Sequence, residues 1–145
     1  LKGFDQILWT DAKEHKYLQE CGTMNLFVVI NGVVLTAGLD EGTILNGVTR
    51  DCVIQILRSQ GIPVEERQVS IDEVLKAYKD GTLDEVFGSG TAANIIYVNE
   101  LHYHNRSIAL KPHAAWKIAP LLLKELNDLH AGRAENARDW MWKVS

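Results

Sequence analysis

The spacing of hydrophobic and polar residues changes near residue 49. Before that point, short apolar runs alternate with turn residues, as they do in antiparallel sheets. Asn31-Gly32 is a strong signal for a two-residue hairpin turn between the last two runs. The predicted strands cover residues 7–10, 17–20, 25–30 and 33–36. We therefore expect this part of the chain to form an antiparallel meander.

Helical spacing begins at Thr49, where apolar residues recur every three or four positions until Gly61 and Pro63 end the pattern. Residues 70–73, Ser-Ile-Asp-Glu, predict a capping box, in which the serine and glutamate side chains bind each other's backbone N–H groups. This box opens a second predicted helix, which runs to about Lys79. A third helix is predicted over residues 114–130. Further strands are expected at 64–69, 95–98 and 140–144, with a hairpin around 104–106. These elements predict a single α/β domain.

Composition narrows the class of protein. The chain has 145 residues, of which 46% are hydrophobic, and this is enough to bury one core. Its net charge is −4 and its 15 basic residues are scattered, which argues against nucleic acid as a partner. No apolar run approaches the roughly 20 residues that cross a bilayer, so we expect no membrane association and a cytoplasmic location. Cys21 and Cys52 lack disulfide or metal-ligand spacing, so we expect thiols that are packed or at the edge of a pocket.

Two glycine-containing stretches are candidate anion sites. At Gly47-Val48-Thr49 the backbone N–H groups that begin a helix have no partner within it, and they can bind phosphate together with the threonine hydroxyl. The alternative is that Gly47 is a turn residue and Thr49 an ordinary N-cap. Residues 88–91, Gly-Ser-Gly-Thr, follow the next run and could wrap an oxyanion, although a bend or bulge is the simpler interpretation. The two turns together favour one shared anion pocket.

Other candidate groups give weaker signals. Glu20 begins the stretch that joins two predicted strands, where its carboxylate could face a buried cationic or protonated ring nitrogen or could simply be solvated at the strand end. His102 and His104 share one strand face but lack a third ligand, so we interpret them as exposed hairpin residues rather than a metal site. The sequence contains neither a Gly-x-Ser-x-Gly motif nor a P-loop, which leaves serine hydrolase and Walker-type chemistry without support.

Four segments, taken together and in order, resemble the branched-chain amino acid aminotransferases of pyridoxal-phosphate fold type IV. They are "ILWTDAKEHKYLQECGTMNLF" (7–27), "LDEGTILNGVTRD" (39–51), "DGTLDEVFGSGTAA" (80–93) and "DWMWKV" (139–144). The resemblance covers nearly the whole chain. It implies an α/β fold with a twisted, barrel-like, mainly antiparallel sheet and flanking helices.

The resemblance also implies roles for individual residues. Gly47, Val48 and Thr49 would hold the phosphate of pyridoxal 5'-phosphate at the helix N-terminus, and the Thr91 hydroxyl would bind the same phosphate. Glu20 matches the carboxylate that pairs with the pyridinium nitrogen and keeps it protonated. Thr23 and the backbone N–H of Ala92 match positions that meet the substrate carboxylate. Asn46 stands where many relatives have proline.

The family's catalytic lysine lies in an upstream Lys-x-Gly-Gly-Asn-Tyr motif that this sequence does not contain. The chain begins with Leu1, and we expect residues 1–145 to be the C-terminal, cofactor-binding domain of a longer homodimeric enzyme. That enzyme would transfer amino groups between leucine, isoleucine or valine and 2-oxoglutarate, giving glutamate, while this chain alone would be inactive. The alternatives are a D-amino acid aminotransferase or aminodeoxychorismate lyase of the same fold, and a noncatalytic module that binds a phosphorylated ligand.

Overall fold

The computed structural model describes residues 3–92 and 94–133, so the strand predicted at 140–144 lies outside the described residues. The first four strands are β1 (Leu8–Thr10), β2 (Leu18–Cys21), β3 (Met24–Ile30) and β4 (Val33–Thr36). They are followed by α1 (Val48–Ser59), β5 (Val64–Glu66), α2 (Ile71–Lys79), β6 (Leu83–Gly90) and β7 (Asn94–Tyr97). The hairpin β8 (Glu100–Tyr103) and β9 (Arg106–Ala109), a 3-10 turn (His113–Ala115) and α3 (Ile118–His130) come last.

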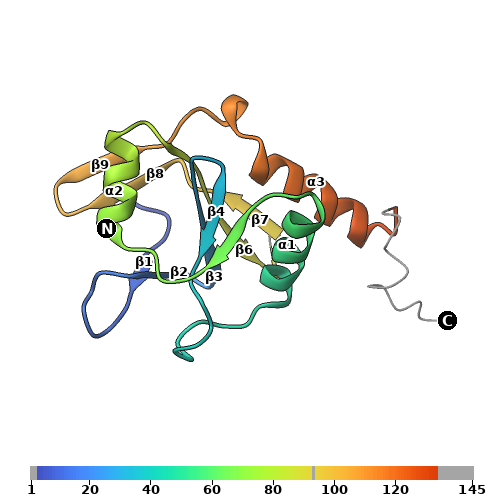
Figure 1. Ribbon diagram of the computed structural model, residues 1–145, viewed down its shortest axis with the longest axis horizontal. Coiled ribbons are helices and arrows are strands. Elements are labelled where there is room, and N and C mark those ends of the chain that lie inside the picture. The colour runs from blue at the N-terminus through green and yellow to red at the C-terminus, as the bar shows by residue number, and fades with distance from the viewer. Residues whose placement is uncertain (1–2, 93, 134–145) are drawn as a thin grey trace.

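Strands β1 to β7 form one sheet around β3 (Figure 1). One edge of β3 pairs with β2 near its start and with β4 further along, while its other edge pairs with β6. All pairs are antiparallel except β4 and β5, which run parallel because α1 connects them. Asn31 and Gly32 have φ values of 51° and 77°, as the predicted hairpin turn requires. The predicted α/β class and mainly antiparallel sheet are confirmed.

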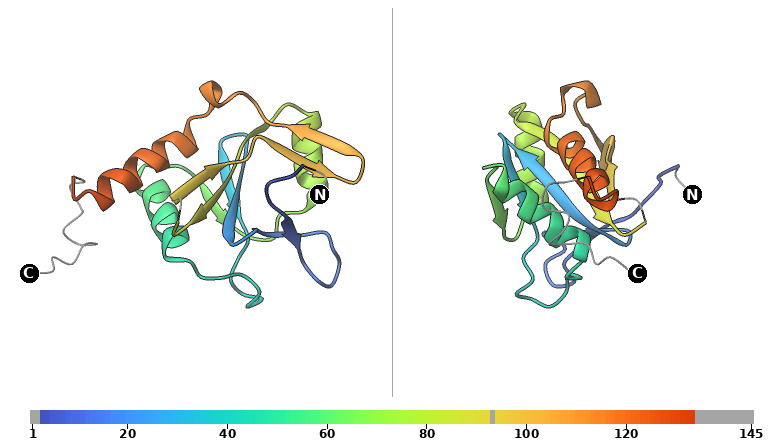
Figure 2. Two further views of the ribbon diagram at one scale, coloured as in Figure 1. Left: turned by 180° about the vertical axis from the view of Figure 1, so that it is seen from behind. Right: turned by 90° about the vertical axis from the view of Figure 1, so that its right-hand side faces the viewer.

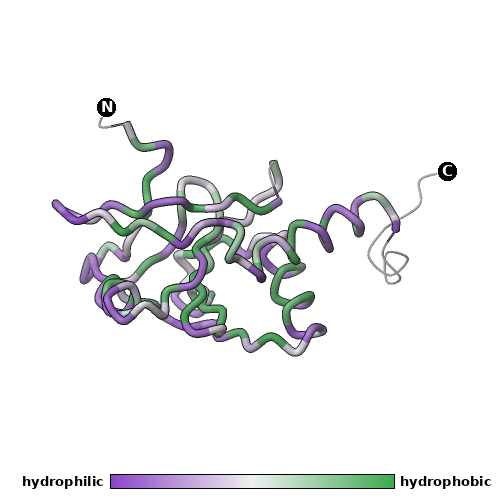
Figure 3. The backbone as a smooth tube through the Cα atoms, turned by 90° about the horizontal axis from the view of Figure 1, so that it is seen from above, coloured by the Kyte–Doolittle hydropathy of each residue, from purple (hydrophilic) through white to green (hydrophobic). Residues whose placement is uncertain are grey.

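Each face of the sheet carries its own hydrophobic cluster because side chains alternate along the strands. On one face, α1 and α3 lie side by side over Phe27, Val29 and Phe87 (Figures 1 and 2). On the other face, α2 and the β8–β9 hairpin cover Val28 and Val86. Hydrophobic and hydrophilic residues alternate along α3 (Figure 3), and the buried residues of this helix are all hydrophobic.

The start of α3 differs from the prediction. The helix begins at Ile118 rather than at residue 114, and Pro120 lies in its first turn, where a missing N–H costs nothing. The reason is the buried Glu85 of β6, whose carboxylate accepts the backbone N–H groups of Lys117, Ile118 and Ala119 at 2.6, 2.9 and 2.7 Å. A carboxylate from a neighbouring strand therefore caps this helix.

The glycine-rich stretch 88–90 is also different from the prediction, because it forms neither a bend nor an anion-wrapping loop. Gly88 and Gly90 belong to β6: Gly88 pairs with Leu26 of β3 and Ile96 of β7, and Gly90 pairs with Asn94 of β7. A Cβ atom at either position would lie only 3.2 or 3.1 Å from Met24 on β3. The glycines therefore make room for a side chain on the adjacent strand, and the chain turns after them, at Thr91 and Ala92.

Two polar side chains organise the ends of other elements. Ser70 caps α2 by accepting the backbone N–H of Glu73 at 3.1 Å, but the carboxylate of Glu73 pairs with Arg67 instead of completing the capping box. Asp11 accepts backbone N–H groups from Tyr17, Glu14 and Lys16, which orders the loop between β1 and β2. These hydrogen bonds hold the pKa of Asp11 well below its usual range.

Candidate functional site

Glu20 lies on β2, and hydrogen bonds hold one oxygen of its carboxylate. Its neighbour across the strand pair is Asn25 of β3. Oε1 of Glu20 accepts hydrogen bonds from Nδ2 of Asn25 at 3.3 Å and from the backbone N–H of Leu45 at 3.2 Å. Within the described residues, Oε2 accepts no hydrogen bond. The half-buried side chain is thus held through one of its two oxygens.

The start of α1 lies against the same asparagine. Gly47 is the N-cap, and a Cβ atom there would lie 2.5 Å from Oδ1 of Asn25. No side chain caps this helix end, and its first internal bond runs from the Asp51 N–H to the Gly47 carbonyl. The N–H groups of Val48 and Thr49 precede that bond. They therefore have no partner within the helix, as is general for the first N–H groups of an α-helix.

The alternative interpretation of Thr49 as an N-cap is wrong, because Gly47 occupies that position and Thr49 is the second residue of the helix. Val48 is 82% exposed and Thr49 is half-buried. Gly47, Val48 and Thr49 therefore form an open helix start, and Asn25 joins it to Glu20.

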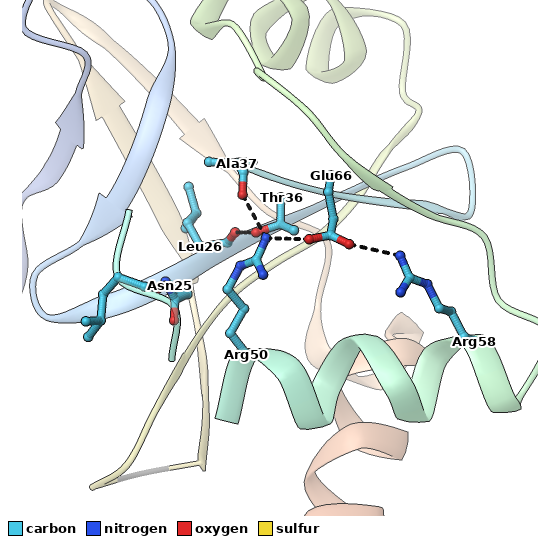
Figure 4. Close-up of polar contacts among 8 residues, drawn as sticks. Asn25, Leu26, Thr36, Ala37, Arg50, Arg58 and Glu66 are labelled. Carbon is cyan, nitrogen blue, oxygen red and sulfur yellow. Dashed lines mark hydrogen bonds and ion pairs between the residues drawn. The ribbon is translucent and has the colours of Figure 1, made fainter. Parts of the chain in front are cut away.

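A buried arginine, Arg50, extends from the first turn of α1 toward β5 (Figure 4). Arg50 is 2% exposed, and its Nη2 donates to the Ala37 carbonyl at 3.0 Å and to Glu66 at 2.9 Å. Arg58, from the last turn of α1, binds the other oxygen of Glu66 at 2.9 Å. Burial disfavours the charged form of Glu66, but the two arginines outweigh it and lower its pKa. The guanidinium of Arg50 thus anchors α1 to β5 and does not extend to the open helix start.

The β6–β7 turn brings Thr91 and Ala92 to the same end of the sheet. Ser89 pairs with Asn25, so Glu20, Asn25 and Ser89 form a row across three strands. Thr91 lies two residues beyond this row and is exposed. The Ser89 hydroxyl is buried and has no hydrogen-bond partner among the described residues.

Thr23 lies in the turn between β2 and β3, at the same end of the sheet as Thr91 because β3 and β6 run antiparallel in register. It is exposed and borders a surface hollow of about 540 Å³ whose other walls include Ile7 and Trp9. The structure thus brings all seven predicted site residues to one end of the central strands. They are Glu20, Thr23, Gly47, Val48, Thr49, Thr91 and Ala92.

No metal site accompanies this arrangement: in residues 3–92 and 94–133, no group of three histidine, cysteine or acidic side chains could hold an ion. His102 and His104 are exposed on the β8–β9 hairpin, as predicted. Cys21 and Cys52 are free thiols, and burial raises the pKa of both. None of the helices in the described ranges is both long and apolar enough to cross a membrane.

Sequence reasoning missed Asn25, Arg50 and Ser89 as parts of this end of the molecule. Each is polar and at most 5% exposed. Asn25 and Ser89 interrupt otherwise apolar or small-residue strands, and that interruption was the available signal. A polar residue within a buried strand needs a partner, but the sequence alone does not name it.

A sheet that joins a carboxylate to an open helix N-terminus is an arrangement that can hold a ligand with a basic ring and an anionic tail. The family model described as amino-transferase class IV matches residues 1–101. The chain therefore belongs to the class IV aminotransferase family.

Among its relatives, branched-chain-amino-acid transaminase 1 of Bacillus subtilis (strain 168) is 43% identical over 142 residues. The match covers 98% of this chain and 40% of that protein. The mitochondrial branched-chain amino acid aminotransferase 1 of Humulus lupulus is 32% identical, over 99% of this chain and 34% of its own length. This chain thus spans about 40% of the length of the first of these relatives.

Solved structures agree with this assignment. The T.th. branched-chain amino acid aminotransferase, complexed with N-(5'-phosphopyridoxyl)-L-glutamate, superimposes with a TM-score of 0.80 at 29% identity, over 99% of this chain and 43% of that chain. The branched-chain aminotransferase from Thermoproteus uzoniensis with norvaline gives a TM-score of 0.79 at 29% identity, covering 95% and 41%. The fold is therefore that of fold type IV aminotransferases.

Proposed function

We propose that this chain is the C-terminal, cofactor-binding part of an aminotransferase that uses pyridoxal 5'-phosphate to move amino groups between branched-chain amino acids and 2-oxoglutarate. Family membership and the names of the relatives support the reaction class. The observation that carries the proposal is the connection of Glu20 to the open start of α1 through Asn25 and Leu45. When bound, the cofactor supplies an electron sink for the substrate carbon.

The residues present fit this cofactor. The uncapped N–H groups of Val48 and Thr49, with the Thr49 and Thr91 hydroxyls, would hold its phosphate. Gly47 lets the helix start lie close against Asn25, since a side chain there would meet the Asn25 Oδ1. The free Oε2 of Glu20 would face the ring nitrogen and, as an anion, would keep a proton on it.

The part of the site that binds substrate would lie at the β2–β3 and β6–β7 turns, beyond the row formed by Glu20, Asn25 and Ser89. Thr23 and the backbone N–H of Ala92 would bind the substrate carboxylate, from the β2–β3 and β6–β7 turns. The intact enzyme would be a homodimer, and its catalytic lysine would lie outside these residues. We therefore expect no steady turnover of leucine, isoleucine or valine with 2-oxoglutarate by this chain alone.

Cofactor binding by the purified chain tests the proposal. Fluorescence titration with pyridoxal 5'-phosphate should give weak, saturable binding, and mass spectrometry after borohydride reduction should find no specific lysine adduct. Glu20→Gln and Thr49→Val should each weaken binding about tenfold, because each removes one charge-assisted hydrogen bond. The matched controls Asp84→Asn and Thr82→Val, both beside the β3–β4 turn at the other end of β3, should bind as the wild type does.

Two results would contradict the proposal. If the wild-type chain does not bind the cofactor, or if the site variants bind it as tightly as the controls, the assignment of these residues is wrong. A steady transamination rate from the 145-residue chain would instead contradict the view that it is part of a longer enzyme. Substrate profiling of a full-length protein would then separate branched-chain from other amino donors.

A further inference from the structure

We propose that Asn25 is a positioning residue that fixes the Glu20 carboxylate and the first turn of α1 relative to each other, so that both bind one molecule at the same time. The inference rests on the proposed function, since it assigns Glu20 to the ring end and the helix start to the phosphate end of one ligand. Asn25 itself would not touch that ligand.

The hydrogen bonds of Asn25 support this role. Its Nδ2 donates to Oε1 of Glu20 at 3.3 Å and to the backbone carbonyl of Leu45 at 2.8 Å, so both of its protons are used. The orientation of the amide is thereby determined, because a reversed amide would point Oδ1 at two acceptors. Leu45 also donates its own N–H to Glu20 at 3.2 Å. Three groups thus form a closed ring of hydrogen bonds.

The position of Asn25 makes this ring rigid. The side chain is 5% exposed and belongs to the central strand, which is paired on both edges. Its Oδ1 lies so close to Gly47 that a Cβ atom there would be 2.5 Å away. One buried amide therefore contacts the carboxylate, the peptide before the helix and the helix N-cap. Without it, the segment before α1 loses its only side-chain contact from β3 among the described hydrogen bonds.

This geometry predicts a particular pattern of affinities. Two binding groups held in a fixed relation act on a ligand that contains both parts, because the second contact then forms at little further entropic cost. Without the Asn25 side chain, the Glu20 carboxylate and the first turn of α1 are both still present, but their relative position is no longer fixed. The loss of affinity should therefore be larger for a ring-plus-phosphate ligand than for either part alone.

The experiment uses probes that cannot form adducts with lysine: pyridoxine 5'-phosphate, pyridoxine and inorganic phosphate. Calorimetric or fluorescence titrations are run on the wild type, Asn25→Asp and Asn25→Leu. The aspartate variant keeps the shape but faces Glu20 and the Leu45 carbonyl with an acceptor. Val28→Ala, on the same strand but the opposite face, controls for general loss of stability. Glu20→Gln serves as the reference for loss of the ring contact alone.

We expect Asn25→Asp and Asn25→Leu to weaken binding of pyridoxine 5'-phosphate at least about tenfold, and binding of inorganic phosphate less than about threefold. Glu20→Gln should weaken both ring-containing probes and leave phosphate binding unchanged. Val28→Ala should leave all three affinities unchanged. If the Asn25 variants bind all probes like Val28→Ala, or weaken all three equally, the positioning role is refuted.

A second measurement needs no variant and remains decisive if the Asn25 variants fail to fold. In nuclear magnetic resonance spectra of the wild type, both pyridoxine and inorganic phosphate should shift the side-chain amide resonance of Asn25. If neither shifts it while both bind, the inference is wrong. If the wild type binds no probe, the proposed function fails first, and the two failures are thereby distinguished.

Discussion

At the scale of single residues, Gly47 shows how an absent side chain determines the geometry of the site. Its φ and ψ of −71° and 137° are open to any residue, so its backbone does not require glycine. The available space does require glycine, because a Cβ atom at this position would lie only 2.5 Å from Oδ1 of Asn25. The position of α1 therefore depends on a contact rather than on backbone freedom.

Gly47→Ala should destabilise the chain by about 1–3 kcal/mol, since Asn25 is held by two hydrogen bonds and cannot move aside without losing them. Urea unfolding measures the effect. The matched control is Gly38→Ala, where a Cβ atom would make only ordinary contacts at 3.7 Å and no positive φ is present. That variant should be neutral or stabilised by less than about 1 kcal/mol. Equal destabilisation of both variants would show that the Asn25 contact is not what excludes a side chain at Gly47.

Residue roles were only partly predictable from the sequence. The helix start at Gly47, Val48 and Thr49 could be identified from the change in hydrophobic period, because that pattern is local. The role of Asn25 could not, since it depends on which strand pairs with β3 and on the path of the segment before α1. Buried polar contacts between distant segments follow from tertiary structure, which a linear pattern does not contain.

At the scale of elements, the sequence predicted the two hairpins and the first two helices well, because their turn and cap residues are neighbours in the chain. The start of α3 was wrong for the opposite reason. Its cap is Glu85, which lies 32 to 34 residues earlier and binds three N–H groups of the first turn. Glu85 is 3% exposed, so hydrogen bonds from the helix N-terminus replace the hydrogen bonds that water would make to its carboxylate.

Glu85→Gln should lower the free energy of unfolding by about 2–3 kcal/mol, because one oxygen becomes an N–H donor that faces other donors. Chemical denaturation gives the free energy, and hydrogen exchange at residues 117–119 shows whether the first turn opens. Lys111→Gln is the control: it breaks the exposed ion pair with Asp84 nearby and should cost less than about 1 kcal/mol. A Glu85→Gln effect as small as that of the control would mean that the cap contributes little.

At the scale of the whole molecule, the sheet separates two hydrophobic clusters, and the partly buried Leu110 packs against both at their border. Ile54 of α1 belongs to one and Ile71 of α2 to the other. The sequence indicated which helix faces are apolar, but it could not assign α1 and α3 to one side and α2 to the other. That assignment follows from the strand order, in which β6 returns to pair with β3.

Ile54→Val and Ile71→Val should each cost about 0.5–1.5 kcal/mol, and the double variant should cost their sum within about 0.5 kcal/mol. The effects should add because each substitution leaves its own cavity, and the two cavities lie on opposite faces of the sheet. Phe27→Leu and Phe87→Leu provide the contrast, because these rings stack on one face with centroids 5.2 Å apart and should be coupled by more than about 0.5 kcal/mol. Equally strong coupling in both pairs would show that the sheet transmits packing changes between its faces.

The ion-pair cluster behind α1 joins the beginning and the end of the helix to one acid group. Arg50 is in the first turn and Arg58 in the last, and Glu66 receives both. Since its pKa is lowered, the tether is intact above the normal titration range of glutamate and weakens as the pH falls through the shifted value. Protonation would then leave two cations without their shared anion. In acid, both ends of α1 should therefore lose a contact at the same time, while its apolar face stays packed in the core.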